Sequence, residues 1–351
     1  MPPSALRIGL IGAGRMGAAH AGFIAREEET VLVGVADPFS SALAEAEGVP
    51  HFADHHALLD PNGGAGLDAV IVANPNGAHV ATALDCIAVG VPTLLEKPVA
   101  VEHAEAARLI AAEAASDVPV LVGHHRRHHP AVTAARELIS AGAIGRLVGV
   151  SGIWTTRKDD TYFDAAWRRE EGAGVMLINL VHDLDLMRHL CGEIVAVQAA
   201  TSNAVRGHEV EDTASVVLTF ADGALGSFLV SDAAVAPWGW DQATEDDPTY
   251  PYRPDTSCYS IAGTTGSLAF PQLAHYFHDG GAAGDWMRPL SLRYEPKGAG
   301  DSYTNQLRHF VRVARGECAP LVSVADAART LAVVEAAGRA AASGRTEPVP
   351  A

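Results

Sequence analysis

The chain has 351 residues, more than one typical hydrophobic core accommodates, so two domains are expected. Hydrophobic residues make up 48% of the chain and charged residues 19%, proportions usual for a globular protein. The formal net charge of −17 disfavours binding to nucleic acid or to anionic membranes, because like charges repel. No apolar run reaches the roughly 18 residues that a membrane-spanning helix needs.

The four cysteines stand far apart in the sequence and form no CxxC pair. This spacing predicts neither structural disulfides nor a thiolate metal site, and it favours a reducing cytoplasm. The N-terminal residues pass directly into a strand-like RIGLIG, without the basic and apolar regions of a signal peptide. We therefore expect a cytoplasmic protein.

The first third of the chain alternates between short apolar segments and helical segments. The strand-like segments are 7–12, 31–37, 69–74, 91–98 and 118–124, and the helical ones run to about 26, over 79–90 and over 101–115. This alternation is typical of a doubly wound α/β fold with a parallel sheet. We predict a Rossmann dinucleotide-binding domain over residues 1–124.

The pattern changes after about residue 125. Helical segments at 130–141 and 174–191 precede strand-like segments at 194–205, 213–220, 224–231, 257–262, 267–271 and 290–294, and two more helices follow at 303–315 and 323–343. Strands without intervening helices indicate a mostly antiparallel sheet. We predict a second α/β domain over 125–351, with a large open sheet that binds substrate and mediates oligomerisation. The acidic stretch 237–256 is predicted to be a long loop, with Asp241, Glu245, Asp246 and Asp247 on a solvated edge.

A glycine-rich motif, GAGRMG, follows the first predicted strand and precedes a helix. Gly12 permits the tight turn, Gly14 lets the backbone approach a pyrophosphate, and Gly17 lets the helix pack on the strand. Asp37 ends the next strand, where its carboxylate can accept hydrogen bonds from ribose hydroxyls and repel a 2′-phosphate. No arginine follows in Pro38, Phe39 and Ser40, so the motif predicts NAD rather than NADP.

A lysine lies at the carboxyl end of another predicted strand, in the sequence Glu96-Lys97-Pro98. In open α/β sheets this edge faces the ligand crevice. Pro98 biases Lys97 away from helical backbone geometry. A lysine beside a nicotinamide can hold a reacting hydroxyl and help to accept its proton, although a solvated surface lysine would fit the position equally well.

Five motifs in this order resemble the Gfo/Idh/MocA oxidoreductases: GLIGAGRMG, ADP (36–38), ANPNGAHV (73–80), EKPVA (96–100) and LINLVHDLDL (177–186). The likeness extends over nearly the whole chain. It implies a Rossmann domain, an α/β domain with an open sheet, and reversible NAD-dependent oxidation of a secondary hydroxyl on a sugar or cyclitol. It also implies a homodimer or homotetramer that associates through that sheet.

The resemblance assigns roles residue by residue. Lys97 and His182 fall on the family's catalytic lysine and histidine, and Arg127 falls on a position that contacts substrate in inositol dehydrogenases. Trp167 and Arg168 match a Trp-Arg pair near the cofactor or substrate. The implied cofactor-binding residues are Gly12, Ala13, Gly14, Arg15, Met16, Gly17, Asp37, Ala73, Asn74, Pro75, Asn76, His79, Glu96, Lys97, Trp167 and Arg168.

One position departs from the family pattern. The family commonly has an aspartate four residues before the histidine, where this chain has Ile178. Asn179 follows it, and on an α-helix Asn179 and His182 are i,i+3 neighbours that can face the same side. An asparagine does not stabilise an imidazolium as a carboxylate does, but its amide can hold a substrate hydroxyl.

Further candidates for contact with substrate are Lys158 and Tyr162, in the loop TTRKDDTYF, and Trp238, in the acidic stretch. Polar groups can bind sugar hydroxyls and an aromatic face can stack on a sugar ring. Two histidine groups, at 124–129 and at 51–56, raise the question of a metal. Arg126 and Arg127 oppose a divalent ion in the first group, and we expect no metal.

The predicted function is therefore hydride transfer between NAD and a secondary hydroxyl of a sugar, cyclitol or related cyclic diol. Inositols, aldoses, amino or carboxylated sugars and cyclic diols all remain open as substrates. Two other functions remain open at this point: a non-catalytic NAD-binding sensor, and an NAD-dependent glycosidase that reduces and reoxidises its cofactor within each turnover.

Overall fold

The computed structural model describes residues 5–170, 172–281 and 284–350. The chain divides into two compact units, the first comprising residues 1–125 and 303–331 and the second comprising 126–302 and 332–351. The first segment of the first unit ends at residue 125, one residue after the predicted boundary at 124. The division differs from the prediction because residues 303–331 also belong to the first unit. The reason is local packing: the Tyr303 ring stacks on Phe23 at 5.0 Å, and the Val122 amide donates to the Val322 carbonyl at 2.9 Å.

The first unit contains a six-stranded sheet in the order β3-β2-β1-β4-β5-β6, and every pair in it is parallel. Its strands are β1 (Leu6–Ile11), β2 (Thr30–Ala36), β3 (His51–Phe52), β4 (Ala69–Val72), β5 (Thr93–Leu95) and β6 (Val120–Val122). The strand order reverses between β1 and β4. In such sheets ligands bind at the carboxyl ends of the strands at this switch point.

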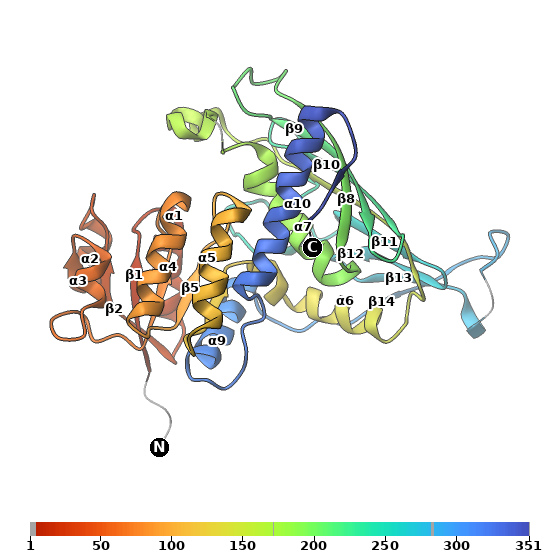
Figure 1. Cartoon of the computed structure of the whole chain (residues 1–351). Coiled ribbons are helices and arrows are strands. Elements are labelled where there is room, and N and C mark those ends of the chain that lie inside the picture. The colour runs from red at the N-terminus through yellow and green to blue at the C-terminus, as the bar shows by residue number, and fades with distance from the viewer. Residues whose placement is uncertain (1–4, 171, 282–283, 351) are drawn as a thin grey trace. The chain divides into compact units, whose positions relative to one another are not determined.

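Helices connect these strands (Figure 1). They are α1 (Arg15–Arg26), α2 (Ala42–Glu47), α3 (His55–Leu59), α4 (His79–Ala88) and α5 (His103–Ala114), and the late helix α9 (Ser302–Ala314) adds to them. The short helix α3 packs directly on the sheet, because a Cβ on Gly9 or Gly34 would meet the Leu58 side chain at 3.2 or 2.9 Å. Small residues in β1 and β2 thus let α3 approach.

The second unit contains a nine-stranded sheet in the order β14-β13-β12-β11-β7-β10-β9-β8-β15. The strands are β7 (Leu147–Thr155), β8 (Ile194–Ser202), β9 (Thr213–Phe220), β10 (Leu225–Ser231), β11 (Tyr259–Gly263), β12 (Gly266–Phe270), β13 (Ala274–Phe277), β14 (Ser291–Tyr294) and β15 (Glu347–Pro348). Only the β7–β10 pair is parallel among the described pairs of this sheet. The predicted fold class, a Rossmann domain plus a mostly antiparallel open sheet, is confirmed.

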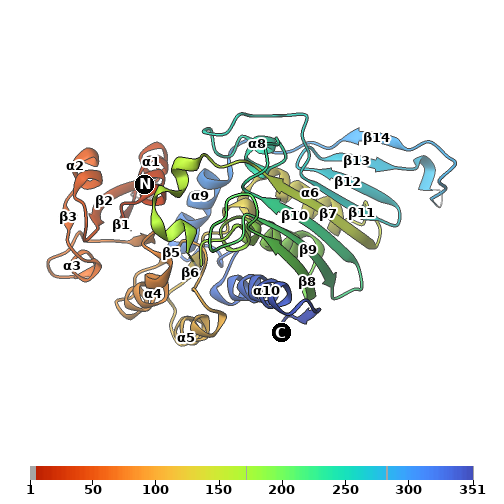
Figure 2. The same cartoon turned by 90° about the horizontal axis from the view of Figure 1, so that it is seen from above.

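One face of this sheet forms the core of the second unit. Helices α6 (Pro130–Ser140), α7 (Val181–Cys191) and α10 (Val324–Ser343) contribute buried residues to the same core cluster as the strands. Figure 2 shows α10 running along β8 and β9. Burial alternates along β9 and β10, and the opposite face exposes Val217, Leu225 and Leu229. The predicted open face is therefore present.

Strand β7, which lies inside this sheet, was not predicted from the sequence. Its residues LVGVSGIWT include two glycines, which weaken a strand pattern. A Cβ on Gly152 would collide with the Phe228 ring of the neighbouring strand β10. The glycine is therefore a packing requirement of the sheet and does not interrupt it.

The acidic stretch 237–256 also differs from the prediction, because it contains a short helix, α8 (Trp240–Thr244). Trp240 is fully buried, and its indole Nε1 donates to Asp246 at 2.8 Å. Asp246 also accepts from the Ser302 backbone amide at 2.9 Å and from the Ser302 hydroxyl at 2.6 Å. The prediction of a solvated acidic edge is wrong for Asp246, which joins α8 to the start of α9.

No helix among the described residues has both the length and the apolar character required to cross a membrane. Cys86, Cys191, Cys258 and Cys318 are all free thiols.

Candidate active site

The glycine motif lies at the switch point of the parallel sheet. Gly12 follows β1 with a positive φ of 96°, and a Cβ there would lie 2.5 Å from the Ala73 carbonyl oxygen, just after β4. A Cβ on Gly17 would collide with the Gly12 carbonyl oxygen. The loop after β1, the loop after β4 and the first turn of α1 thus pack backbone against backbone.

Gly14 has the opposite environment, because a Cβ there would meet no atom within 4 Å. It is the N-cap residue of α1 and, as a glycine, has no side chain that could accept a hydrogen bond from the amides of the first helical turn. The first N–H groups of a helix that no side chain caps attract anions. This exposed, open position therefore fits the pyrophosphate of a dinucleotide. Arg15 is exposed and Met16 is half-buried beside it.

Asp37 follows β2 and is fixed by backbone amides. One carboxylate oxygen accepts from the Ala13 amide at 2.8 Å, and the other accepts from Phe39 and Ser40 at 2.8 and 3.0 Å. The carboxylate is half-buried and directly joined to the glycine motif. A carboxylate has about four acceptor sites, and three backbone amides occupy three of them, so the oxygen that faces Ala13 retains capacity for a ribose hydroxyl.

The turn that carries Lys97 follows β5, and the Lys97–Pro98 peptide bond is cis. Glu96 is buried; its Oε1 faces His20 Nε2 at 2.8 Å, and its Oε2 accepts from the Lys97 amide at 3.2 Å. Burial alone would raise the pKa of Glu96, but the hydrogen bond and charge of His20, with Lys97, hold that pKa below its ordinary value. Glu96 is thus an ionised anchor for the Lys97 turn, and its contact with the cofactor stays a prediction.

His79 connects this turn to the loop after β4. Its ring is buried, with Nδ1 2.7 Å from the Pro98 carbonyl and Nε2 3.0 Å from the Asn74 carbonyl. Asn74 in turn donates from Nδ2 to the Thr82 hydroxyl at 2.9 Å. His79 therefore braces two loops, which accounts for its burial, while Pro75 is exposed and Asn76 is half-buried beside it.

In the second unit, His182 lies near the start of α7 and is half-buried. A π-helical segment, η5 (Met176–Leu180), immediately precedes α7, and the Val181 amide donates back to Met176, five residues earlier. The wider π turn means that the α-helical i,i+3 argument for Asn179 and His182 does not hold here. Single π turns are frequent at functional sites.

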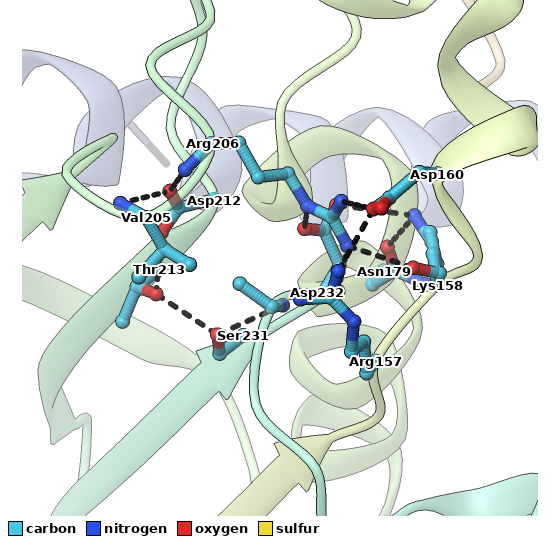
Figure 3. Close-up of polar contacts among 11 residues, drawn as sticks. Arg157, Lys158, Asp160, Asn179, Val205, Arg206, Asp212, Thr213, Ser231 and Asp232 are labelled. Carbon is cyan, nitrogen blue, oxygen red and sulfur yellow. Dashed lines mark hydrogen bonds and ion pairs between the residues drawn. The ribbon is translucent and has the colours of Figure 1, made fainter.

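Asn179, on this π turn, contacts Lys158. Its Oδ1 accepts from Lys158 Nζ at 2.8 Å, and the same Nζ lies 3.6 Å from the Asp232 carboxylate. The other oxygen of Asp232 accepts from Arg206 Nε at 2.8 Å, so one buried carboxylate serves two cations. Figure 3 shows Lys158, Asn179, Asp232 and Arg206 in this connected network.

Arg206 extends the network to the chain around Lys158. Its guanidinium donates to the Lys158 carbonyl at 2.9 Å and to Asp160 at 3.2 Å, and Arg157 donates to the same Asp160 oxygen at 2.9 Å. Asp212 fixes the Arg206 backbone by accepting its amide at 2.9 Å. The backbone and the side chain of Lys158 are therefore both held in place, with the side chain only 11% exposed.

The predicted loop residues gather around Tyr162. Lys158 Nζ lies 4.7 Å from the Tyr162 ring centroid, and the Arg168 guanidinium lies 4.0 Å from it. Arg168 also donates to the Tyr162 carbonyl at 2.6 Å and lies 5.2 Å from the Trp167 ring. Trp167 is 54% exposed and Trp238 is 47% exposed, so both present aromatic surface to solvent, and their contact with a ligand stays a prediction.

Arg127 has a different environment from the one predicted. It is buried, and its guanidinium donates to both oxygens of Asp185 at 2.8 and 2.6 Å. The neighbouring Arg126 donates to Asp183 at 3.0 Å and to the Tyr259 hydroxyl at 3.1 Å. These two pairs fix the part of α7 that directly follows His182. They account for Arg127 structurally, and its contact with substrate stays a prediction.

The sequence reasoning did not find His20, Arg206, Asp212 or Asp232. His20, Arg206 and Asp232 lie far along the chain from the residues that they support, Asp212 lies six residues from Arg206, and none of the four belongs to a recognisable motif. Only the alternation of buried positions in β9 and β10 could have indicated that Asp212 and Asp232 lie at the neighbouring ends of adjacent strands.

The parallel sheet in the order 3-2-1-4-5-6, the glycine loop and Asp37 define an NAD-binding oxidoreductase. The profile described as "Oxidoreductase family, NAD-binding Rossmann fold" matches residues 6–124, and the profile of the GFO/IDH/MocA C-terminal domain matches 132–269. The chain belongs to the Gfo/Idh/MocA family of oxidoreductases, and its cofactor is NAD.

The relatives and solved structures agree with this assignment. Inositol 2-dehydrogenase 1 of Saccharopolyspora erythraea is 30% identical, over 97% of this chain and 95% of the relative. The myo-inositol 2-dehydrogenase of Thermotoga maritima is 27% identical over 92% of each chain. A levoglucosan dehydrogenase solved with NADH shares the fold, with a TM-score of 0.79 and 23% identity, over 99% of this chain and 100% of that one. Like its named relatives, the protein is an enzyme, an NAD-dependent dehydrogenase that acts on CH–OH groups.

Alanine substitutions at Gly14 and Gly17 should have different effects, because the protein leaves room for a methyl group only at Gly14. Gly14→Ala should leave the melting temperature unchanged and weaken NAD binding at least about tenfold, because the new methyl group meets pyrophosphate but no protein atom. Gly17→Ala should lower both NAD affinity and the melting temperature, because the helix must move away from the loop. Thermal unfolding and NAD titration measure the two effects.

Gly338→Ala is the matched control, since Gly338 lies in α10 and a Cβ there also meets nothing within 4 Å. It should keep NAD affinity and raise stability slightly. Normal NAD affinity in the Gly14→Ala protein would contradict the assigned position of the pyrophosphate.

Proposed function

We propose that the enzyme transfers a hydride between NAD and a secondary hydroxyl of a sugar, a cyclitol or a related cyclic diol. The observation that carries this proposal is the fixed position of Lys97 at the switch-point edge of the parallel sheet. His79 ties its turn to the cofactor loop, and Glu96 with His20 supports it from within. The names of the inositol and levoglucosan dehydrogenases among its relatives support the substrate class.

Lys97 and His182 are the proposed catalytic residues. NAD, when bound, supplies the acceptor for the hydride that leaves the carbinol carbon. The Lys97 ammonium donates a hydrogen bond to the hydroxyl oxygen and stabilises the negative charge that develops there as its proton leaves. His182 accepts this proton through its imidazole, and the hydroxyl becomes a carbonyl.

Lys158, Tyr162 and Asn179 are proposed to bind the substrate's remaining hydroxyls, with Arg168, Trp167 and Trp238 at the edge of this surface. Lys158 is held by Asn179 and by the shared carboxylate of Asp232, so its ammonium is oriented before substrate arrives. A preoriented donor loses less entropy on binding than a mobile surface lysine.

Four free cysteines support the cytoplasm as the compartment.

We also propose that the protein is a homodimer or homotetramer that associates through the open face of the nine-stranded sheet. This face combines Val217, Leu225 and Leu229 with small polar residues such as Ser215 and Ser227. An apolar surface of this kind is costly in water unless it is covered. Small residues between the apolar ones permit close face-to-face packing of two sheets.

The first prediction concerns catalysis. A panel of inositols, aldoses and cyclic diols, followed at the NADH absorbance band, should yield at least one substrate. On that substrate Lys97→Ala should lower kcat by at least about two orders of magnitude while NAD binding persists. His182→Ala should lower kcat similarly or somewhat less.

Lys297→Ala is the matched control, because Lys297 is exposed on the segment after β14, and it should keep full activity. Near-normal turnover in Lys97→Ala would overturn the mechanism. Tight NAD binding with no turnover on any member of the panel would favour a non-catalytic sensor.

The second prediction separates substrate binding from catalysis. Lys158→Ala and Asn179→Ala should each raise the KM for the polyol, by about 10- to 100-fold for a lost hydrogen bond to a charged group, with a smaller change in kcat. The double variant should raise the KM by less than the product of the two single increases. The reason is that Asn179 acts by orienting the ammonium that Lys158→Ala already removes. Steady-state kinetics of the four proteins test this. A fall in kcat alone for Asn179→Ala would instead assign Asn179 to the role of the family's missing aspartate.

The third prediction concerns assembly. Light scattering at micromolar concentration should give a multiple of the 36.6 kDa chain mass, and Leu229→Lys should shift the protein toward the monomer. Val235→Lys is the control, because Val235 is 87% exposed outside the sheet. A wild-type mass of one chain would rule out the proposed assembly.

A further inference from the structure

In the folded chain, a carboxylate lies beside the second histidine group of the sequence, the one at 51–56. His55 and His56 open the short helix α3, and Asp85 projects from α4, 30 residues away from His55. His55 Nε2 lies 2.8 Å from Asp85 Oδ2, and His56 Nε2 lies 3.9 Å from the same oxygen. The two imidazole rings lie together with their centroids 4.1 Å apart.

We propose that His55, His56 and Asp85 bind a divalent first-row transition-metal ion such as Zn²⁺. Two imidazole nitrogens and one carboxylate oxygen form a donor set that these ions prefer over Mg²⁺ or Ca²⁺, which take oxygen ligands. Among the described residues, this is the one group of three such side chains whose ligand atoms all lie within 4.8 Å of one another. The sequence alone did not indicate it, because Asp85 is remote from both histidines along the chain.

The two distances from the histidines to Asp85 require only small adjustments. Metal bonds of about 2.0–2.1 Å at tetrahedral angles place ligand atoms about 3.3 Å apart. The His55–Asp85 distance of 2.8 Å must open and the His56–Asp85 distance of 3.9 Å must close, each by about half an ångström. His56 is 69% exposed at its side chain, so its ring can turn without disturbing the core.

Space for the remaining ligand lies beside the cluster. His56 and Asp85 line a surface hollow of about 210 Å³ together with Asp60, Leu59, Pro61 and Val89. A water molecule can complete a four-coordinate ion from this hollow.

The ion would stabilise the nucleotide-binding unit by joining α3 to α4. The Leu58 side chain of α3 packs against Gly9 in β1 and Gly34 in β2. These are the strands whose carboxyl ends carry the glycine motif and Asp37. A bond between the two helices therefore restrains the part of the unit that supports those two strands.

The test uses the full chain without a polyhistidine tag, stripped of metal by a chelator and then dialysed. Titration calorimetry with ZnCl₂ should show one ion per chain, and MgCl₂ at the same concentration should give no binding heat. Zn²⁺ should also raise the melting temperature, because an ion that binds only the folded state stabilises it. A Co²⁺-loaded sample should show the visible absorption bands of a tetrahedral site.

Variants decide where the ion binds. His56→Ala removes an exposed ligand, so it should fold normally without metal and lose at least tenfold in Zn²⁺ affinity, together with the rise in melting temperature. Asp85→Asn should behave in the same way. The matched control, His103→Ala, changes a histidine at the start of α5 in the same unit and should bind Zn²⁺ normally. Absence of Zn²⁺ binding by the wild-type protein, or equal binding by His56→Ala, would overturn the proposal.

Discussion

The close approach of two backbones at the switch point is the constraint on which the cofactor site depends. Gly12 takes a positive φ and lies against the carbonyl of Ala73, and Gly17 lies against the carbonyl of Gly12. No side chain fits at either position, so the loop after β1, the loop after β4 and helix α1 are fixed relative to one another. His79 then extends this arrangement to a third loop, because its two ring nitrogens contact the carbonyls of Asn74 and Pro98. The position of Lys97 is thus a consequence of backbone packing that begins at a glycine.

The second unit positions its polar residues differently, through a shared buried charge. Asp232 faces Arg206 with one oxygen and Lys158 with the other, and Arg206 also holds the carbonyls of residues 158 and 232. A buried carboxylate is costly unless its charge is compensated, and here the Arg206 guanidinium and the Lys158 ammonium compensate it. Removal of Asp232 would leave the cations Lys158 and Arg206 without their shared carboxylate, so Asp232 is the centre of the network. This explains how a loop, rather than a helix or strand, can hold Lys158 in a fixed direction.

The sequence predicted those features whose causes are local. The glycine motif with its flanking strand and helix, the turn after β5 and the alternation of strand and helix each lie within a short stretch of residues, and each has a counterpart in the structure. The features that were missed arise from contacts between distant segments. Strand β7 was obscured by Gly152, a residue explained only by the Phe228 ring on the neighbouring strand. Residues 303–331 pack with the first unit, although the sequence placed them in the second domain, because neither segment has a sequence feature that indicates the stacking of Tyr303 on Phe23. Asp246 was predicted to be solvated because it lies in an acidic run. In the structure it is buried and accepts hydrogen bonds from Trp240 and Ser302.

The choice between lysine and arginine across the chain follows the same physical logic. Of its 25 basic residues only three are lysines, and two of these are Lys97, proposed as a catalytic residue, and Lys158, proposed to bind substrate. The buried arginines make directional pairs: Arg127 donates to both oxygens of Asp185, and Arg188 does the same with Glu193. A planar guanidinium suits such fixed, bidentate contacts with a carboxylate, whereas an ammonium is a compact charge with three rotatable donors. A hydroxyl oxygen that gains charge during a reaction is a single acceptor atom, so a guanidinium cannot form a bidentate contact with it. An ammonium can keep its hydrogen bond to that oxygen when the oxygen shifts slightly. Arginine is therefore used where a carboxylate must be held in a fixed geometry, and a lysine suits the catalytic role that we propose for Lys97.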